Sequence, residues 1–174
     1  EYPNDNFFLC SSSLVVLQAI AQHHRQQFNI PVIGITGSNG KTIIKEWLFQ
    51  LLSPDYDVVK SPGSYNSQLG VPLAVMQMQP HHQLGIFEAG LSRSGEMEKL
   101  EVILQPTIGI FSNIGPAHDE GVVSRQQKVE EKMKLFSRCP LLIFCYDHEP
   151  VRQVVLASGR PHLSWGRHGQ ADVR

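Results

Sequence analysis

The sequence has no excess of either charge. Fifteen lysines and arginines stand against sixteen aspartates and glutamates, which leaves a formal net charge of −1 at pH 7. A protein that binds nucleic acid needs a basic face, because contacts to phosphates supply most of the affinity. The composition therefore argues against nucleic acid as the main partner.

Cysteines are few, and long apolar runs are absent. The three cysteines, Cys10, Cys139 and Cys145, are odd in number and lack metal-ligand spacing, so we expect free thiols in a reducing cytoplasm. No apolar run approaches the roughly 18 residues that a membrane span needs, and no segment resembles a signal peptide. We expect a cytoplasmic protein with no membrane span.

Size and termini indicate part of a larger protein. The 174 residues, 41% hydrophobic and 18% charged, are typical of one globular domain. The chain begins at Glu1 without a methionine and ends at "GQADVR". From these ends we expect a piece excised from a longer chain.

Short apolar runs alternate with helical patterns along the chain. Strands are predicted at 31–36, 57–60, 84–89, 107–113 and 141–146, and helices at 11–28, 41–52, 71–78, 95–104 and 124–136. Continuously apolar strands that alternate with helices are typical of a parallel sheet covered on both faces. The sequence therefore predicts an α/β fold. In the second helix, Ile44, Trp47, Leu48 and Leu51 share one face, which we expect to be the buried one.

The turn between the first strand and the second helix carries the clearest chemical signal. It reads Thr36-Gly37-Ser38-Asn39-Gly40-Lys41-Thr42. The start of a helix offers free N–H groups and a positive dipole end, which favour phosphate. Lys41 can reach the β- and γ-phosphates, and the Thr42 hydroxyl can bind Mg²⁺. The strict G-x-x-x-x-G-K-[ST] pattern is not met, because Ile35 stands where the first glycine belongs, and a turn that is merely tight is the alternative.

Five ordered segments resemble the Mur ligases and their relatives, the folylpolyglutamate synthases. Besides the turn they are "YNSQLGVPL" (65–73), "FEAGLSRSGEMEKL" (87–100), "PTIGIFSNIGPAH" (106–118) and "KVEEKMKLF" (128–136). The E-x-G followed by G-E-M is most similar to the branch that adds D-Ala-D-Ala to UDP-N-acetylmuramoyl-tripeptide, and the sequence also resembles fusions of that ligase to an alanine racemase. The match covers about residues 12–147.

The resemblance implies a domain layout and a reaction. Residues 1–30 would be a connector helix from an absent N-terminal domain, and 31–174 a P-loop-type central ATP-binding domain, followed by an absent C-terminal domain. The substrates would be UDP-MurNAc-tripeptide and D-Ala-D-Ala, joined through an acyl phosphate with ATP and two Mg²⁺ ions in peptidoglycan precursor synthesis. The isolated piece should not ligate.

The resemblance also assigns site residues. Gly37, Ser38, Asn39 and Gly40 would surround the phosphates, with Asn113 as a further nucleotide contact. Glu88 stands at a strand end, where a carboxylate suits Mg²⁺, and His118 would be a second metal or phosphate ligand. Asn66 would lie beside the γ-phosphate, although a turn-forming role is equally open. Asp147 would contact ribose, but Cys145 replaces the family asparagine near adenine, which leaves adenine recognition in doubt.

Lys132 is informative in two ways. It projects between Leu135 and Phe136, inside the apolar arc of its predicted helix, whereas most lysines lie on a solvated face. Burial favours the neutral amine, which is a nucleophile. Its position matches the lysine that Mur ligases carry as a carbamate, which would make it an anionic Mg²⁺ ligand.

Two other functions stay open at this stage. One is a different Mur-type amide ligase such as folylpolyglutamate synthase, which would share the turn and Lys132. The other is a non-catalytic nucleotide-binding module. The sequence has no Ser-His-Asp set, cysteine pair or paired carboxylates that would indicate another chemistry.

Overall fold

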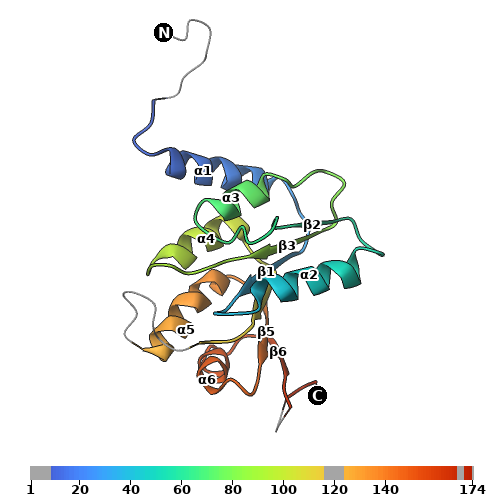
Figure 1. The fold of residues 1–174 in the computed structure, drawn as a ribbon, viewed down its shortest axis with the longest axis vertical. Coiled ribbons are helices and arrows are strands. Elements are labelled where there is room, and N and C mark those ends of the chain that lie inside the picture. Colours follow the sequence, from blue (N-terminus) through green and yellow to red (C-terminus); the bar gives the residue numbers. More distant parts are fainter. Residues whose placement is uncertain (1–8, 116–123, 168–170, 174) are drawn as a thin grey trace, which may run out of the picture.

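Six parallel strands form one sheet in the order β2-β3-β1-β4-β5-β6 (Figure 1). The computed structural model describes residues 9–115, 124–167 and 171–173. The strands are β1 (Val32–Thr36), β2 (Val58–Lys60), β3 (Leu84–Glu88), β4 (Ile108–Phe111), β5 (Leu141–Cys145) and β6 (His162–Trp165). The α/β fold predicted from the sequence is confirmed.

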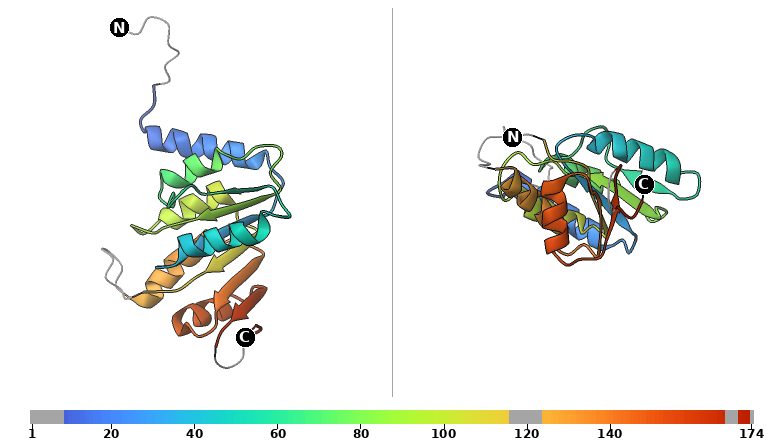
Figure 2. Two further views of the ribbon diagram at one scale, coloured as in Figure 1. Left: turned by 45° about the vertical axis from the view of Figure 1, so that its right-hand side comes forward. Right: turned by 90° about the horizontal axis from the view of Figure 1, so that it is seen from below.

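The helices cover the two faces of the sheet unequally. They are α1 (Ser13–Gln26), α2 (Lys41–Leu52), α3 (Gly70–Val75), α4 (Glu96–Leu104), α5 (Arg125–Met133), the 3₁₀ helix η1 (Lys134–Phe136) and α6 (Glu149–Ala157). Helix α2 lies on one face, whereas α1, α4, α5 and α6 lie on the other (Figure 2). Serine caps begin two of them: Ser12 Oγ accepts from Val15 N at 3.4 Å, and Ser124 Oγ from Gln127 N at 3.2 Å.

Alternating side chains of the strands build two cores. In β1, Val32 joins the large core beneath α3 to α6, whereas Ile33 and Ile35 join the smaller core beneath α2. In β5, Leu142 and Phe144 are fully or almost fully buried in the large core. This period of two explains why the strands read as continuous apolar runs, since each face of a parallel sheet needs its own apolar side chains.

The expected buried face of α2 is wrong. Trp47 is 64% exposed and Leu51 72% exposed, whereas Leu48 and Ile44 do pack on the sheet. Of the twelve residues of α2, all of them described, only Lys45 is buried. The helix is rotated so that Leu48 and Leu52 pack on the sheet and Lys45 reaches the carbonyl oxygens of Ser61 and Gly63.

The region after β5 was not assigned to any element from the sequence. It forms α6 and the edge strand β6, which pairs with β5 from Leu142↔His162 to Cys145↔Trp165. A helical signal was present, because Val151 and Val155 recur at a spacing of four and both are buried. Strand β6 gives little signal, because it is short and alternates exposed Leu163 with buried Ser164.

The carboxyl ends of the central strands meet at one edge of the sheet. Strand β1 lies between β3 and β4, and the register pairs Ile35 with Glu88 and Thr36 with Phe111. The chain leaves β1 through α2 on one face and leaves β3 and β4 through α4 and α5 on the other. In open α/β sheets a ligand crevice forms outside the carboxyl ends at such a change of direction. Among the described residues, no helix combines the length and apolarity needed to cross a bilayer.

Candidate functional site

The turn from β1 into α2 requires glycine at two positions. Gly37 has φ +143°, and a Cβ built there would lie 1.9 Å from Ser112 Oγ. Gly40 has φ +79° and forms the N-cap of α2. The first helical bond runs from Ile44 N to Gly40 O at 2.9 Å. The N–H groups just before Ile44 therefore belong to the free first turn of a helix, which is a natural anion site.

The end of β4 holds this turn in place. Ser38 N donates to Asn113 O at 2.9 Å, and Asn39 N donates to Asn113 Oδ1 at 3.0 Å. Ser112 Oγ donates in return to Asn39 O at 2.8 Å. Asn113, which was predicted to contact nucleotide, is thus bonded to the backbone of the turn and does not line the cavity described next.

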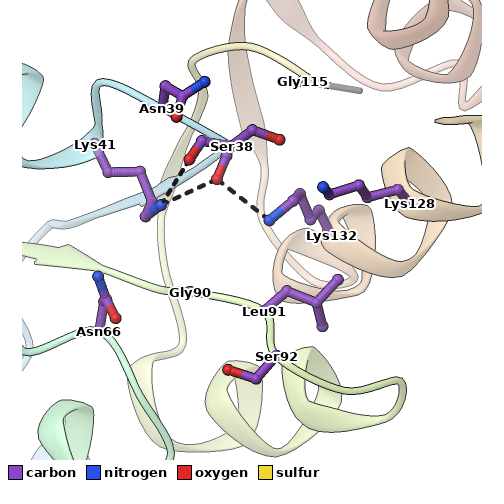
Figure 3. Close-up of a pocket in the computed structure, with 11 residues that line it drawn as sticks. Ser38, Asn39, Lys41, Asn66, Gly90, Leu91, Ser92, Gly115, Lys128 and Lys132 are labelled. Carbon is purple, nitrogen blue, oxygen red and sulfur yellow. Dashed lines mark hydrogen bonds between the residues drawn. The ribbon is translucent and has the colours of Figure 1, made fainter. Parts of the chain in front are cut away.

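A cavity of about 350 Å³ opens beside the turn (Figure 3). Six residues that the sequence singled out line it: Gly37, Ser38, Asn39, Lys41, Asn66 and Lys132. The loop after β3 adds Gly90, Leu91 and Ser92. Backbone and polar side chains form most of this wall, which suits a polar, phosphate-sized ligand better than an apolar one.

Three lysines point into the cavity. Lys41 Nζ donates to Gly37 O at 3.1 Å, and Lys132 Nζ donates to the same carbonyl at 3.2 Å. Lys128 extends from α5 beside Lys132, and the two are 3% and 2% exposed (Figure 3). The burial of Lys132 agrees with the sequence pattern. Converging ammonium groups of this kind favour a polyanion.

Burial lowers the pKa of the Lys41 ammonium. The negative charge of Glu88 acts in the opposite direction and raises it, and the positive charge of Lys128 lowers it again. The charges of Glu88 and Lys128 thus both act on the Lys41 ammonium. A bound anion would counteract the lowering and hold Lys41 in its charged form.

Buried Glu88 and partly exposed Thr42 form a hydrogen-bonded pair next to the cavity. Thr42 Oγ1 donates to Glu88 Oε2 at 2.9 Å, and Glu88 is 0% exposed. The other carboxylate oxygen, Glu88 Oε1, is buried without a hydrogen-bond partner among the described residues. An unpaired buried carboxylate oxygen is costly, so this atom is where a cation would be expected.

The linker between β2 and α3 forms the opposite wall. Asn66 lines the cavity, and its backbone O accepts from Gly90 N at 2.7 Å. A Cβ at Gly90 would lie 2.9 Å from Asn66 Oδ1 and 3.3 Å from Asn66 O, so the absence of a side chain at Gly90 favours the close approach of the two segments. Asn66 therefore stands at the cavity rather than at an isolated turn.

Asp147, like Asn113, is a predicted site residue that does not line the cavity. Asp147 follows β5, and its Oδ2 accepts from Arg167 N at 2.7 Å. It is absent from the described residues that line the cavity. His118 lies outside the described residues. Within the parts of the chain that are described, no group of three His, Cys, Asp or Glu side chains is arranged to hold a metal ion.

Sequence reasoning missed two lysines. Lys128 precedes Lys132 by four residues, a spacing that places both on one helix face and was available as a signal. Lys45 is 0% exposed and donates to Ser61 O at 2.8 Å. No sequence signal marked Lys45, since the helical pattern assigned the buried face to Trp47 and Leu51.

In sequence and in fold, the chain is similar to D-alanyl-D-alanine ligases. The UDP-N-acetylmuramoyl-tripeptide–D-alanyl-D-alanine ligase of Borreliella burgdorferi is 38% identical over 142 residues, which are 79% of this chain and 31% of that protein. The crystal structure of the MurF ligase from Thermotoga maritima in complex with ADP has a TM-score of 0.86 at 30% identity, over 97% of this chain and 40% of that one.

A folylpolyglutamate synthetase from Helicobacter pylori is similar in fold alone. Its TM-score is 0.63 at 15% identity, over 92% of this chain and 51% of that one. Of the D-alanyl-D-alanine ligases described above, the matched part of the chain covers about a third of the length. The model of the Mur ligase middle domain matches residues 35–174. The chain belongs to the Mur ligase middle-domain family.

Proposed function

We propose that this chain is the ATP-binding part of a ligase that adds D-Ala-D-Ala to UDP-MurNAc-tripeptide in peptidoglycan precursor synthesis. One observation carries the proposal. The glycine turn, Lys41, Lys132 and the Thr42–Glu88 pair lie together at the carboxyl edge of the sheet, in a chain whose relatives are named as that ligase.

The turn and the lysines would bind the phosphates of ATP. Lys41 stands at the first turn of α2, where its ammonium can leave the Gly37 carbonyl for a phosphate oxygen. Ser38 Oγ is buried without a hydrogen-bond partner among the described residues and could donate to the same group. The ADP bound in the Thermotoga maritima structure supports a nucleotide here.

The Thr42–Glu88 pair fits Mg²⁺. Both side chains offer hard oxygen atoms, and no described residue donates to Glu88 Oε1. When bound, Mg²⁺ would neutralise charge on the transferred phosphoryl group. Glu88 and Thr42 would hold it, and Lys41 would orient the terminal phosphate beside it.

Lys132 would act as a carbamate and, with His118, hold a second Mg²⁺. Its burial supports this, since a buried lysine without its charge reacts with CO₂ more readily. Bicarbonate labelled with ¹³C should give a carbamate resonance in the full-length protein. Lys132→Ala should remove the resonance, and Lys134→Ala, at the start of η1, should keep it. A resonance that persists in Lys132→Ala would exclude this modification.

The reaction would proceed in two steps. An oxygen of the tripeptide carboxylate attacks the γ-phosphorus, ADP leaves and an acyl phosphate forms. The amine of D-Ala-D-Ala then attacks the acyl carbon, loses a proton and expels phosphate. The chain's own groups would align ATP and offset its charge, which is most of what phosphoryl transfer requires.

Several further roles complete the proposal. Asn66 would lie beside the γ-phosphate, Asp147 would contact ribose, and Asn113 would act by holding the turn. Residues 1–30, with α1, would connect from an N-terminal domain, and 31–174 would form the central domain. The relatives' greater length supports additional domains in the full protein.

Phosphate release by the full-length protein tests the function. We expect release only when ATP, UDP-MurNAc-tripeptide and D-Ala-D-Ala are all present. Release with a folate and glutamate would favour the folylpolyglutamate alternative, and nucleotide binding without release in any mixture would favour a non-catalytic module. Lys41→Met should weaken ATP binding about 10- to 100-fold, because it removes a charge-assisted hydrogen bond. Lys99→Met, on an exposed site of α4, is the matched control.

A further inference from the structure

Lys45 is a fully buried lysine on a helix whose other residues are all at least partly exposed. Its Nζ donates to the carbonyl oxygens of Ser61, at 2.8 Å, and of Gly63. It also pairs with Glu46 Oε1 at 3.3 Å. A buried ammonium group is tolerated only where its hydrogen bonds are satisfied. These three acceptors therefore explain how the fold accommodates a buried Lys45.

Both carbonyl acceptors belong to the linker between β2 and α3. In this linker Ser61 Oγ accepts from Glu88 N at 3.3 Å, and Ser64 Oγ lies 3.3 Å from Thr42 Oγ1. Lys45 thus grips the linker on both sides of Pro62. The same short segment touches Glu88 at one end and Thr42 at the other.

The linker also continues into the wall of the cavity. Two residues beyond Ser64 lies Asn66, whose backbone O accepts from Gly90 N at 2.7 Å. Lys45 stands one helical turn after Lys41. Its hydrogen bonds therefore hold the linker against the same helix that carries the phosphate-binding lysine. A shift of the linker would move several walls of the site together.

We propose that Lys45 is a positioning residue that fixes the relative placement of Thr42 and Glu88, the pair that would hold Mg²⁺. The proposal rests on the proposed function, because it assigns Lys45 a role towards that ion. Lys45 itself does not touch the ligand. It acts through Ser61 on Glu88 and through the 63–64 backbone on Thr42.

The decisive variant is Lys45→Met in the full-length protein, which keeps the length of the side chain and removes the donor. Loss of a group that orients metal ligands typically weakens metal affinity about 10- to 100-fold. We therefore expect the Mg²⁺ concentration for half-maximal ATP binding to rise about tenfold or more. ATP binding in EDTA should change less than about threefold, because Lys41 and the turn are kept.

Lys60→Met is the matched control. Lys60 also pairs with Glu46, whereas the linker carbonyls of Ser61 and Gly63 accept from Lys45. The Lys60→Met variant removes the same charge as Lys45→Met but keeps the bonds from Lys45 to the linker. Its Mg²⁺ dependence should therefore equal that of the wild type. A Lys60→Met variant that shifts as far as Lys45→Met would attribute the effect to charge and overturn the proposal.

Ser61→Ala covers the case in which Lys45→Met does not fold. It keeps the Ser61 carbonyl that Lys45 binds and removes only the hydroxyl next to Glu88. We expect the Mg²⁺ requirement to rise in the same direction. Wild-type Mg²⁺ dependence in Ser61→Ala and in any folded Lys45→Met sinks the role of Lys45. Absence of Mg²⁺-dependent ATP binding in the wild type would instead sink the proposed function.

Discussion

At the residue scale, Glu88 combines a structural cost with a functional use. Its Oε1 is buried without a partner among the described residues, while Oε2 accepts from Thr42. A carboxylate in that state destabilises the fold until a cation satisfies it. Stability and function therefore pull this position in opposite directions.

Glu88→Gln separates the two. Without Mg²⁺ we expect the variant to be more stable than the wild type by about 1–2 kcal/mol, because it removes a buried charge. With Mg²⁺, ATP binding should no longer improve. Thermal unfolding and ATP titrations, each with and without Mg²⁺, measure both effects in the full-length protein.

Glu98→Gln is the control for that pair of measurements. Glu98 is 62% exposed at its side chain and pairs with Lys134 on the surface, so little should change in either assay. A Glu88→Gln variant that is less stable than the wild type and still responds to Mg²⁺ would contradict the role given to Glu88.

At the element scale, α2 shows where sequence periodicity fails. Ile44, Trp47, Leu48 and Leu51 fit an apolar arc, yet Lys45 is the buried residue, Leu48 packs partly buried on the sheet and Trp47 is mostly exposed. The turn fixes where α2 begins, and the linker carbonyls offer acceptors to Lys45. Periodicity counts apolar residues, but it cannot register carbonyl groups that lie 16 residues further along the chain.

On α2, truncating the larger side chain should therefore cost less free energy of unfolding than truncating the smaller one. Trp47→Ala should cost less than about 1 kcal/mol of the free energy of unfolding, because a mostly exposed side chain loses few contacts. Leu48→Ala should cost about 1.5–3 kcal/mol, because Leu48 packs on the core beneath α2. Urea unfolding of both variants measures the order, and a costlier Trp47→Ala would contradict the placement of α2.

A carboxylate of α5 holds the end of the loop after β3. Glu131 accepts from Ser94 Oγ at 3.0 Å and from Gly95 N, and it pairs with Lys134 at 2.9 Å. Burial alone would raise the pKa of Glu131, but the hydrogen bonds from Lys134, Gly95 and Ser94 together lower it. The ionised carboxylate thus ties this loop to the helix that carries Lys132.

Glu131→Gln should loosen the loop that lines the cavity. We expect a loss of about 1–3 kcal/mol in the free energy of unfolding and faster amide exchange at Gly95, because charge-assisted bonds are replaced by neutral ones. Glu130→Gln is the control, since Glu130 is exposed and bonds only to Gln126 among the described residues. Equal exchange at Gly95 in the two variants would show that Glu131 does not hold the loop.

At the scale of the whole molecule, the sequence predicts five of the six strands of the described sheet and six of the residues that line the cavity. Local sequence patterns identify the turn, Lys41, Asn66 and Lys132. Lys132 stands out further because it is a charged residue inside the apolar arc of its helix. Strand β6, the role of Asn113 and the buried Lys45 depend on contacts between distant segments. Contacts between distant segments leave no periodic pattern in the sequence, so the sequence alone does not predict these three features.

The cavity is small for the reaction proposed. At about 350 Å³ it lies at the lower end of ligand pockets, which run from about 300 to 1,000 Å³. It can hold the phosphate end of a nucleotide, but a UDP-linked peptide and a dipeptide need further surfaces. The relatives that this chain matches are about two and a half times its length, which is consistent with such surfaces elsewhere in the full protein.

The 174-residue chain alone should therefore bind ADP but form no amide bond. Binding needs only the turn and the lysines, whereas ligation needs a carboxylate and an amine held in line with the γ-phosphate. Calorimetry with ADP, with the Lys41→Met chain as the control for site binding, measures the first property. Phosphate release from ATP, UDP-MurNAc-tripeptide and D-Ala-D-Ala, compared with the full-length protein, measures the second. Ligation by the chain alone would mean that this one domain positions all three substrates, against the size of its cavity.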